Sequence, residues 1–203
     1  MKIICVGKNY ADHIKEFDGK HPEDIVLFLK PDTAIHNTEL PYYIPDFTND
    51  LHHEVEVILK ITQNGKCISE KFAHKYYEEI GLGIDFTARD LQSSLKQNGL
   101  SWEKCKAFDG SAIIGDFIHK SRLGDLNSLA FRLEKNGQTV QESSTSLMLW
   151  TFDQIIAEAS KFFTLRKGDI IFTGTPAGVG SVAPNDVLEG FLENQKMFTV
   201  NIK

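Results

Sequence analysis

Apolar and polar positions alternate most clearly in the stretch from Glu54 to Ile61. Apolar residues occupy every second position from Val55 onward, with Glu54, Glu56 and Lys60 among the positions between them. This period of two predicts a half-buried strand that carries both glutamates on one face. Neighbouring carboxylates repel each other and glutamate is a poor strand former. The face is therefore either stabilised by a hard divalent cation or solvated, and the stretch alone leaves both interpretations open.

Other short apolar segments predict a chain built mainly of strands. The segment Ile25–Leu29 is apolar throughout, which favours a buried strand, and Asn136-Gly137 is typical of a hairpin turn between two strands. Besides the first stretch, the predicted strands are Lys2–Val6, Ile25–Leu29, Gly81–Phe86, Ile113–Ile118, Ala130–Lys135, Thr139–Gln141, Phe198–Ile202 and the start of the glycine-rich segment Gly168–Gly180.

Helices are fewer and shorter in this interpretation. The pattern predicts helices at Asn9–Phe17, at Phe72–Ile80, in the run between Arg89 and Gly99, and at Phe152–Phe163. Thr87 with Asp90 resembles a capping box, and Gly99 is a plausible helix stop. Between these elements we expect loops at Gly19–Pro22, Asn37–Asp50 and Ser101–Gly110. We also expect a hairpin-type turn at Gln63–Lys66 that leads to a second strand or edge.

Asp85 lies at the end of the predicted strand Gly81–Phe86. Strand ends are places where a rigid scaffold presents functional groups, so Asp85 could supply a third oxygen ligand beside Glu54 and Glu56. Arg89 and Gln92 stand three residues apart on the helix that follows, which places them on one face close to this carboxylate.

His13 and Glu16 are also three residues apart on a predicted helix. A carboxylate in that position can orient an imidazole and raise its basicity, as a general base requires. An exposed ion pair is the commoner meaning of such spacing, and the pair alone favours that alternative. Lys106 lies in a predicted loop, where its position indicates no chemistry by itself.

Composition limits the classes of partner. The chain has 203 residues, enough for one domain with a sizeable core, and its formal net charge of −6 argues against a nucleic-acid partner. Its three widely spaced cysteines are typical of reduced thiols in the cytoplasm. No apolar run reaches the roughly 20 residues of a membrane span. The glycines of Gly168–Gly180 fit no nucleotide-binding motif, so small molecules are the expected ligands.

Six segments, taken together, resemble the fumarylacetoacetate hydrolase family in its short single-domain acylpyruvate hydrolase branch. The resemblance extends from about Cys5 to Val200, and we treat 1–203 as one domain. The segments are Gly7–His13, Phe28–Pro31, His52–Glu56, Asp85–Asp90, Lys106–Gly110 and Thr173–Gly180.

The resemblance implies a fold and a set of site residues. The implied fold is α+β and mainly β, a mixed β-roll or sandwich like the C-terminal domain of the family, in a homodimer. Glu54, Glu56 and Asp85 would bind Mg²⁺ or Mn²⁺, with Ca²⁺ as an inactive occupant. The other implied residues are Lys106, Gln92, Thr175 and, with a less defined role, Arg89 in the substrate pocket, and His13 with Glu16 as a water-activating pair on a lid.

The implied reaction is cleavage of a carbon–carbon bond in an acylpyruvate-type 2,4-diketo acid. The keto acid end would chelate the cation, Lys106 would stabilise developing negative charge, and pyruvate would leave as its enolate. Oxaloacetate offers the same chelating end, so decarboxylation or tautomerisation is the alternative, and a non-catalytic cation-binding protein is a remote one. Asp32, Thr33 and Ile113 depart from the usual residues of the branch, and the first two are expected near the pocket wall.

Overall fold

Two packed β-sheets, a small third sheet and five short helices make up the computed structural model, which describes residues 1–16 and 22–203. The largest sheet has seven strands in the order β2-β1-β11-β5-β6-β8-β3. Its strands are β1 (Ile3–Gly7), β2 (Val26–Lys30), β3 (Ile35–His36), β5 (Val55–Ile61), β6 (Tyr77–Asp85), β8 (Ala112–His119) and β11 (Ile170–Phe172). Two of its pairings are parallel, β1 with β11 and β3 with β8, so the sheet is mixed as predicted.

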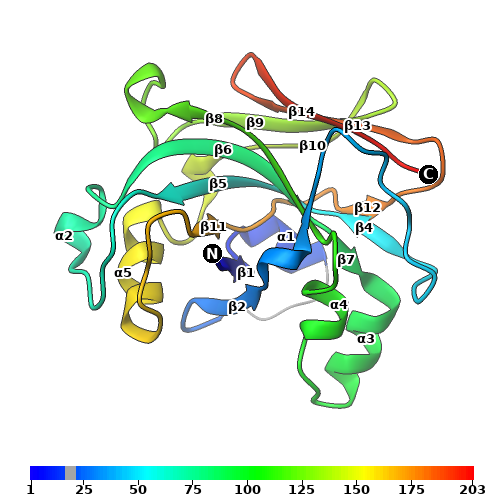
Figure 1. Ribbon diagram of the computed structural model, residues 1–203, viewed down its shortest axis with the longest axis horizontal. Helices are drawn as coiled ribbons and strands as arrows, with labels where there is room; N and C mark the ends of the chain where they lie inside the picture. Colours follow the sequence, from blue (N-terminus) through cyan, green and yellow to red (C-terminus); the bar gives the residue numbers. More distant parts are fainter. Residues whose placement is uncertain (17–21) are drawn as a thin grey trace.

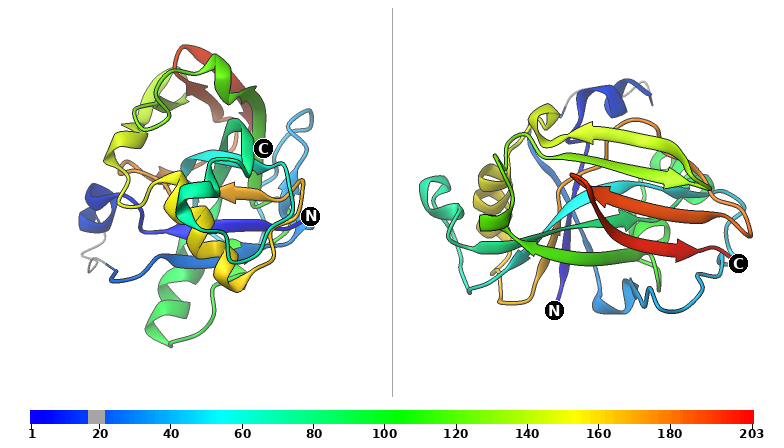
Figure 2. Two further views of the ribbon diagram at one scale, coloured as in Figure 1. Left: turned by 90° about the vertical axis from the view of Figure 1, so that its left-hand side faces the viewer. Right: turned by 90° about the horizontal axis from the view of Figure 1, so that it is seen from above.

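A four-stranded sheet packs against the long central strands β5 and β6, as the view from above in Figure 2 shows. Its order is β10-β9-β13-β14, and all its pairings are antiparallel. The strands are β9 (Ala130–Lys135), β10 (Gln138–Ser144), β13 (Val187–Leu192) and β14 (Gln195–Asn201). The third sheet joins β4 (Leu51–His53), β7 (Thr87–Ala88) and β12 (Gly180–Ser181).

The main hydrophobic core lies between the two large sheets. Val57, Leu59 and Leu82 from the seven-stranded sheet share this core with Leu133 and Leu188 from the four-stranded one. The other face of β5 carries Ile58, which belongs to a smaller cluster made by the neighbouring strands β1, β8 and β11. The even-numbered positions of β5 therefore face away from the four-stranded sheet, and Glu56 is among them.

Four of the five helices occupy the two ends of the seven-stranded sheet, and α1 lies between these ends in the view of Figure 1. Helix α5 packs with α2 at one end, and its residues Ile155, Ile156 and Ala159 enter the core as the amphipathic pattern predicted. Helices α3 and α4 lie together at the other end, beyond the last residue of β6. The bounds are α1 Ala11–Glu16, α2 Glu70–Ala73, α3 Arg89–Gln97, α4 Glu103–Lys106 and α5 Phe152–Phe162.

Two predictions about strand burial are wrong. The stretch from Val55 to Leu59 is buried at every position, because β5 is a central strand with a protein layer on both faces. Conversely, Ile25–Leu29 was expected to be buried, but the corresponding strand β2 is the edge of the sheet and leaves Leu29 exposed. Periodicity reports the face of a strand, whereas its place in the sheet depends on distant segments.

Other local predictions were overruled by tertiary pairing. The helix expected over Phe72–Ile80 is the single turn α2 followed by the start of β6, which pairs with β5 and β8. The Gln63–Lys66 turn leads into α2 and not into a second strand, although Gly65 forms an isolated antiparallel bridge with Leu165. Asp90 accepts hydrogen bonds from Thr48 and Asn49, so it makes no capping box.

Several boundaries are confirmed. Asn136 and Gly137 both have positive φ, as their hairpin turn requires, and α3 ends just before Gly99. Asn37–Asp50 is irregular as expected, whereas Ser101–Gly110 contains the short helix α4. The loop predicted over Gly19–Pro22 lies outside the described residues except for Pro22. Among the described residues, no helix is long and apolar enough to cross a membrane.

Candidate active site

The pairing of β5 with β6 brings the three predicted carboxylates together. Glu54 directly precedes β5, and its carbonyl accepts a hydrogen bond from the Asp85 backbone N–H at 2.9 Å. Glu56 lies one alternation further along β5, opposite Gly83. One carboxylate oxygen from each of Glu54, Glu56 and Asp85 lies within 4.8 Å of the other two. The strand alternation therefore predicted a real cluster of acids, although the cluster is buried.

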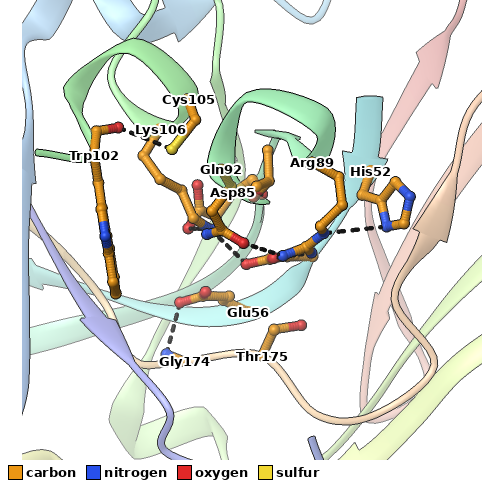
Figure 3. A network of polar contacts seen from close by, with 12 residues as sticks. His52, Glu56, Asp85, Arg89, Gln92, Trp102, Cys105, Lys106, Gly174 and Thr175 are labelled. Atoms are coloured by element: carbon orange, nitrogen blue, oxygen red, sulfur yellow. Dashed lines mark hydrogen bonds and ion pairs between the residues drawn. The ribbon is translucent and has the colours of Figure 1, made fainter. Parts of the chain in front are cut away.

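A pocket of about 310 Å³ opens over these carboxylates. All but one of the nine predicted site residues line it; the exception is Glu16. Figure 3 shows Arg89 and Lys106 directed from α3 and α4 toward the same centre, with Glu56 and Thr175 on the opposite wall. The predicted members that line the pocket are His13, Glu54, Glu56, Asp85, Arg89, Gln92, Lys106 and Thr175.

Three cations neutralise the acids. Lys106 Nζ lies 2.6 Å from Glu54 Oε2 and 2.7 Å from Asp85 Oδ2, and Arg89 Nη2 lies 2.5 Å from Glu54 Oε1. The third cation is Lys30, whose Nζ is 2.8 Å from Asp85 Oδ1. Three cationic side chains thus lie beside three buried carboxyl groups, and buried charges of this kind are stable only when they have partners.

The ionisation of these groups follows from burial and from their neighbours. Burial alone would raise the pKa of Glu54, but Lys106 and Arg89 together hold that pKa well below its usual range. Burial lowers the pKa of Lys106, yet the two carboxylates more than offset this and raise it. The pKa of Glu56 is raised by burial and by the charges of Asp85 and Glu54. Of the three carboxylates, Glu56 is the one that most lacks positive charge.

Glu56 receives its hydrogen bond from a loop. Gly174 N–H donates to Glu56 Oε2 at 2.6 Å, just after β11 ends. Gly174 has a φ of +104°, and a Cβ at this position would lie 2.6 Å from Asn9 Cβ. Only glycine fits both conditions, so the glycine-rich segment supplies a close backbone approach to the acid cluster. It does not form a phosphate loop.

His13 reaches the pocket from α1. Its Nδ1 is 3.3 Å from Glu16 Oε2, which confirms the predicted pairing of these side chains. Burial lowers the pKa of His13, although Glu54 and Glu16 act against that shift, so a neutral imidazole is favoured at pH 7. Glu16 Oε1 also accepts a hydrogen bond from Gly178 N–H at 3.0 Å. The pair is therefore anchored to the glycine-rich segment and is not a simple exposed ion pair.

The remaining walls combine aromatic rings with further cations. Phe28 and Trp102 line the pocket with an edge-to-face contact between their rings, and Lys96 Nζ lies 5.5 Å from the centre of the Trp102 ring. Lys8 also lines the pocket. Asp32 and Thr33, which were expected near the pocket wall, are exposed in a 3-10 turn and do not line it.

Sequence reasoning missed two buried polar residues beside the site. Lys30 is fully buried, and its Nζ contacts the Lys106 carbonyl and both oxygens of Ser111 in addition to Asp85. Gln141 is buried next to Thr175. Lys30 lies in one of the family-like segments, which was the only available signal, because a lysine at the end of an apolar run is usually exposed.

The donor set fits a hard divalent cation. All three acids offer oxygen, the atom that Mg²⁺ and Mn²⁺ prefer, and their oxygens already converge. Asp85 Oδ1 contacts Lys30 only as an ion pair and accepts no directed hydrogen bond among the described residues. Glu56 has the raised pKa described above. A cation held by Glu54, Glu56 and Asp85 would satisfy both groups.

Comparisons with known proteins find relatives over nearly the whole chain. The pattern of the family described as fumarylacetoacetate (FAA) hydrolase C-terminal matches residues 2–201. The mitochondrial oxaloacetate tautomerase FAHD1 of Bos taurus is 41% identical over 92% of this chain and 85% of its own length. The mitochondrial oxaloacetate decarboxylase of Dictyostelium discoideum is 38% identical over 93% of this chain and 87% of its own.

Among solved structures, fumarylpyruvate hydrolase from Pseudomonas aeruginosa, in complex with Mn²⁺ and pyruvate, superposes with a TM-score of 0.93. It is 33% identical and matches 100% of this chain and 89% of its own. The same fold thus occurs in relatives named for two kinds of 2-keto acid chemistry. The names of the two sequence relatives also include the mitochondrion, so the predicted cytoplasmic location stays a prediction.

Proposed function

This chain belongs to the fumarylacetoacetate hydrolase family, and from that premise we propose that it is an enzyme for 2-keto acids with oxaloacetate as its substrate. The reaction we favour is keto–enol tautomerisation, with decarboxylation as a related outcome. The observation that carries the proposal is the near full-length similarity to oxaloacetate enzymes at 38% and 41% identity. The sequence interpretation ranked acylpyruvate hydrolysis first, and these relatives support its alternative better.

The charges of the pocket favour an anionic ligand of this kind. Besides the three acids, four cationic side chains line it among the described residues: Lys8, Arg89, Lys96 and Lys106. A divalent cation held by the acids would add two more positive charges and would polarise a keto group as a Lewis acid. Oxaloacetate is a dianion with a chelating keto acid end, so it matches the sign of this charge.

The chain's own residues supply binding and proton transfer. Lys106 and Arg89 place positive charge beside the position where the keto oxygen gains negative charge. In tautomerisation, a base removes a proton from C3, the electron pair forms the C2=C3 bond, and the keto oxygen becomes a hydroxyl after it accepts a proton. His13 suits the role of base, because its imidazole is neutral at pH 7 and is oriented by Glu16.

Decarboxylation needs the same charge arrangement but a different bond. The C3–C4 bond breaks, carbon dioxide leaves, and the electron pair forms the same C2=C3 enolate, which is later protonated at C3. Which reaction occurs therefore depends on whether a base removes the C3 proton or the C3–C4 bond breaks. Tautomerisation ranks above decarboxylation because only tautomerisation needs a base such as His13 to remove a proton.

Hydrolysis of an acylpyruvate is the second candidate, and the His13–Glu16 pair together with the fumarylpyruvate hydrolase likeness favours it. Water that attacks the distal carbonyl would lose its proton to His13, and the C–C bond would break to release pyruvate as its enolate. A base of this kind typically contributes about 10²- to 10⁴-fold to the rate.

One set of assays separates these reactions. Protein with Mg²⁺ is given oxaloacetate, acetylpyruvate or fumarylpyruvate, with enol–keto conversion followed by ultraviolet absorbance and pyruvate formation by a coupled assay. We expect the fastest metal-dependent rate for oxaloacetate interconversion, above a control of buffer with the same Mg²⁺. A faster release of pyruvate from either diketo acid would replace tautomerisation with hydrolysis as the function.

The variants His13→Ala and Glu16→Gln sharpen the assay. If His13 is the base, both variants slow interconversion of oxaloacetate, whereas its decarboxylation falls far less because no proton has to be removed first. Equal losses in both reactions would exclude the pair as a dedicated base. If no 2-keto acid is turned over while Mg²⁺ still raises the melting temperature, the chain is the remote alternative, a non-catalytic cation-binding protein.

A further inference from the structure

Gln141 belongs to the four-stranded sheet but reaches into the active-site region. It is only 2% exposed, although the neighbouring positions of β10 are exposed or half-buried. The pairing of β10 with β9 shifts register between Thr139 and Gln141, which is a β-bulge. Bulges re-aim side chains next to functional sites, and this one directs the Gln141 amide out of its own sheet.

Two backbone groups fix the orientation of that amide. Val55 N–H, which can only donate, lies 3.0 Å from Gln141 Oε1. The Pro176 carbonyl, which can only accept, lies 3.1 Å from Gln141 Nε2. Exchanging the oxygen and nitrogen would break both contacts, so the orientation follows from the chemistry of the backbone alone.

This orientation determines the direction of a third hydrogen bond. Gln141 Nε2 is 2.9 Å from Thr175 Oγ1, and an amide nitrogen can only donate, so the threonine oxygen is the acceptor. The hydroxyl proton of Thr175 must then point elsewhere. Among the described residues no acceptor for it is found, and Thr175 lines the pocket. Its hydroxyl proton is therefore available for donation to an occupant of the pocket that Thr175 lines.

We propose that Gln141 is a positioning residue that commits the Thr175 hydroxyl to donate its proton to an oxygen of the bound 2-keto acid. The assignment rests on the proposed function, because it takes a 2-keto acid as the occupant of the pocket. A threonine hydroxyl without such a neighbour could rotate and accept as readily as donate. With Gln141 in place, only an acceptor such as a carboxylate or keto oxygen is matched.

The packing around Gln141 fixes the position of its side chain next to the glycine-rich segment. Gly178 has a φ of +92°, and a Cβ there would lie 2.4 Å from the Val140 carbonyl in the bulge. The glycine-rich segment that carries Thr175 thus lies directly on the bulge that carries Gln141. His53 Nδ1 occupies the remaining lone pair of Gln141 Oε1 at 3.0 Å, so every polar atom of the amide has a partner.

A double-mutant cycle tests the proposal with pyruvate as the probe. Its dissociation constant for the Mg²⁺-loaded protein is measured by calorimetry in wild type, Gln141→Met, Thr175→Val and the double variant. A hydrogen bond to a charged acceptor corresponds to roughly a 10- to 150-fold change, so each single variant should weaken binding at least about tenfold. If Gln141 acts through Thr175, the double variant should be no weaker than Thr175→Val. Losses that multiply, or full affinity in Gln141→Met, would overturn the proposal.

Gln141→Glu adds a second measurement, the pH dependence of pyruvate affinity, which should not change if Gln141 has only a structural role. The introduced carboxyl group can donate to Thr175 only while it is protonated, so pyruvate affinity should fall as pH rises through its pKa. The same dependence should vanish in the Thr175→Val background. Gln138→Met, an exposed position of the same strand, is the matched control and should leave affinity unchanged.

Nuclear magnetic resonance provides a test that needs neither turnover nor a Gln141 variant, so a folding defect in those variants cannot affect it. The side-chain amide protons of Gln141 should exchange slowly with water in wild type, and one should exchange faster in Thr175→Val. Fast exchange in wild type would overturn the proposed geometry. If the amide is protected but wild type neither binds pyruvate nor converts oxaloacetate, the proposed function fails and the 2-keto acid acceptor fails with it.

Discussion

The two ends of the β5–β6 pair carry ion pairs of the same length in opposite surroundings. At one end Lys60 Nζ lies 2.7 Å from Glu79 Oε2, and the side chains are 39% and 36% exposed. At the other end Lys106 Nζ lies 2.7 Å from Asp85 Oδ2, and the side chains are 5% and 1% exposed. Glu79 and Asp85 even project from the same face of β6, because their positions differ by an even number.

The difference lies in what surrounds each pair and not in the pairs themselves. Water screens the Lys60 pair, so either charge can be removed at little cost. The buried end holds Glu54, Glu56 and Asp85 against Lys30, Lys106 and Arg89, where a single deletion leaves an uncompensated charge. Charges held without solvent are also those that act most strongly on a reacting substrate. One end of the β5–β6 pair therefore carries only a surface ion pair, whereas the other end carries the candidate active site.

The largest expected effect is on stability, from Lys30→Met. The substitution keeps most of the buried stem but leaves Asp85 with one cation fewer, and breaking a buried pair costs about 3–5 kcal/mol. Urea unfolding without metal should show a loss of that size. Added Mg²⁺ should restore part of it, because a divalent cation replaces the missing charge. A loss under 1 kcal/mol would show that Lys30 is not needed to balance the acids.

Lys106→Met should lower oxaloacetate turnover by at least about 100-fold, or roughly 2.7 kcal/mol in the activation free energy. The reason is that Lys106 is a preorganised positive charge in the substrate pocket, held there by Glu54 and Asp85. Steady-state kinetics with saturating Mg²⁺ measure the effect. Near-normal turnover would restrict Lys106 to a structural role.

Glu56→Gln should abolish stabilisation by metal while the protein still folds. Burial and the charges of Asp85 and Glu54 raise the pKa of Glu56, so its neutral form is favoured without metal, and the neutral amide should leave the metal-free protein folded. Wild type should gain about 2.7 kcal/mol when Mg²⁺ is present at a hundred times its dissociation constant, and the variant should gain almost none. Glu79→Gln is the control and should retain the full gain. A full gain in Glu56→Gln would remove Glu56 from the ligand set.

The sequence predicted the acidic residues of the candidate active site better than the buried polar residues that surround them. Alternation in β5 and the acid that ends β6 both arise from neighbours along the chain, so Glu54, Glu56 and Asp85 could be identified as candidates. Helical spacing singled out His13 with Glu16 and Arg89 with Gln92, and the resemblance to the family added Lys106 and Thr175. Their positions around one pocket agree with the prediction, except that Glu16 contacts His13 from outside the pocket lining.

The missed features all depend on segments far apart in the chain. Lys30 is buried because the carbonyl of Lys106 and the oxygens of Ser111 come to it from about 80 residues away. Gln141 acquires its role from a bulge and from a loop that follows another strand. The expected helix over Phe72–Ile80 became a strand because β5 and β8 flank it. No local pattern encodes such partners, and tertiary context overrides local propensity.

The smallest expected effect comes from Lys60→Met, the same substitution as Lys30→Met made at the exposed end of the sheet. Its ion pair with Glu79 is screened by water, and exposed pairs contribute about 0–1 kcal/mol. The contact between Lys60 and the Phe117 ring adds about 0.5–1 kcal/mol at an exposed site. Urea unfolding should therefore show a loss below about 2 kcal/mol that shrinks in high salt, with turnover and metal response unchanged. If Lys60→Met lost as much unfolding free energy as Lys30→Met, burial would not be the difference between the two ends, because the same substitution would cost the same at an exposed and at a buried site.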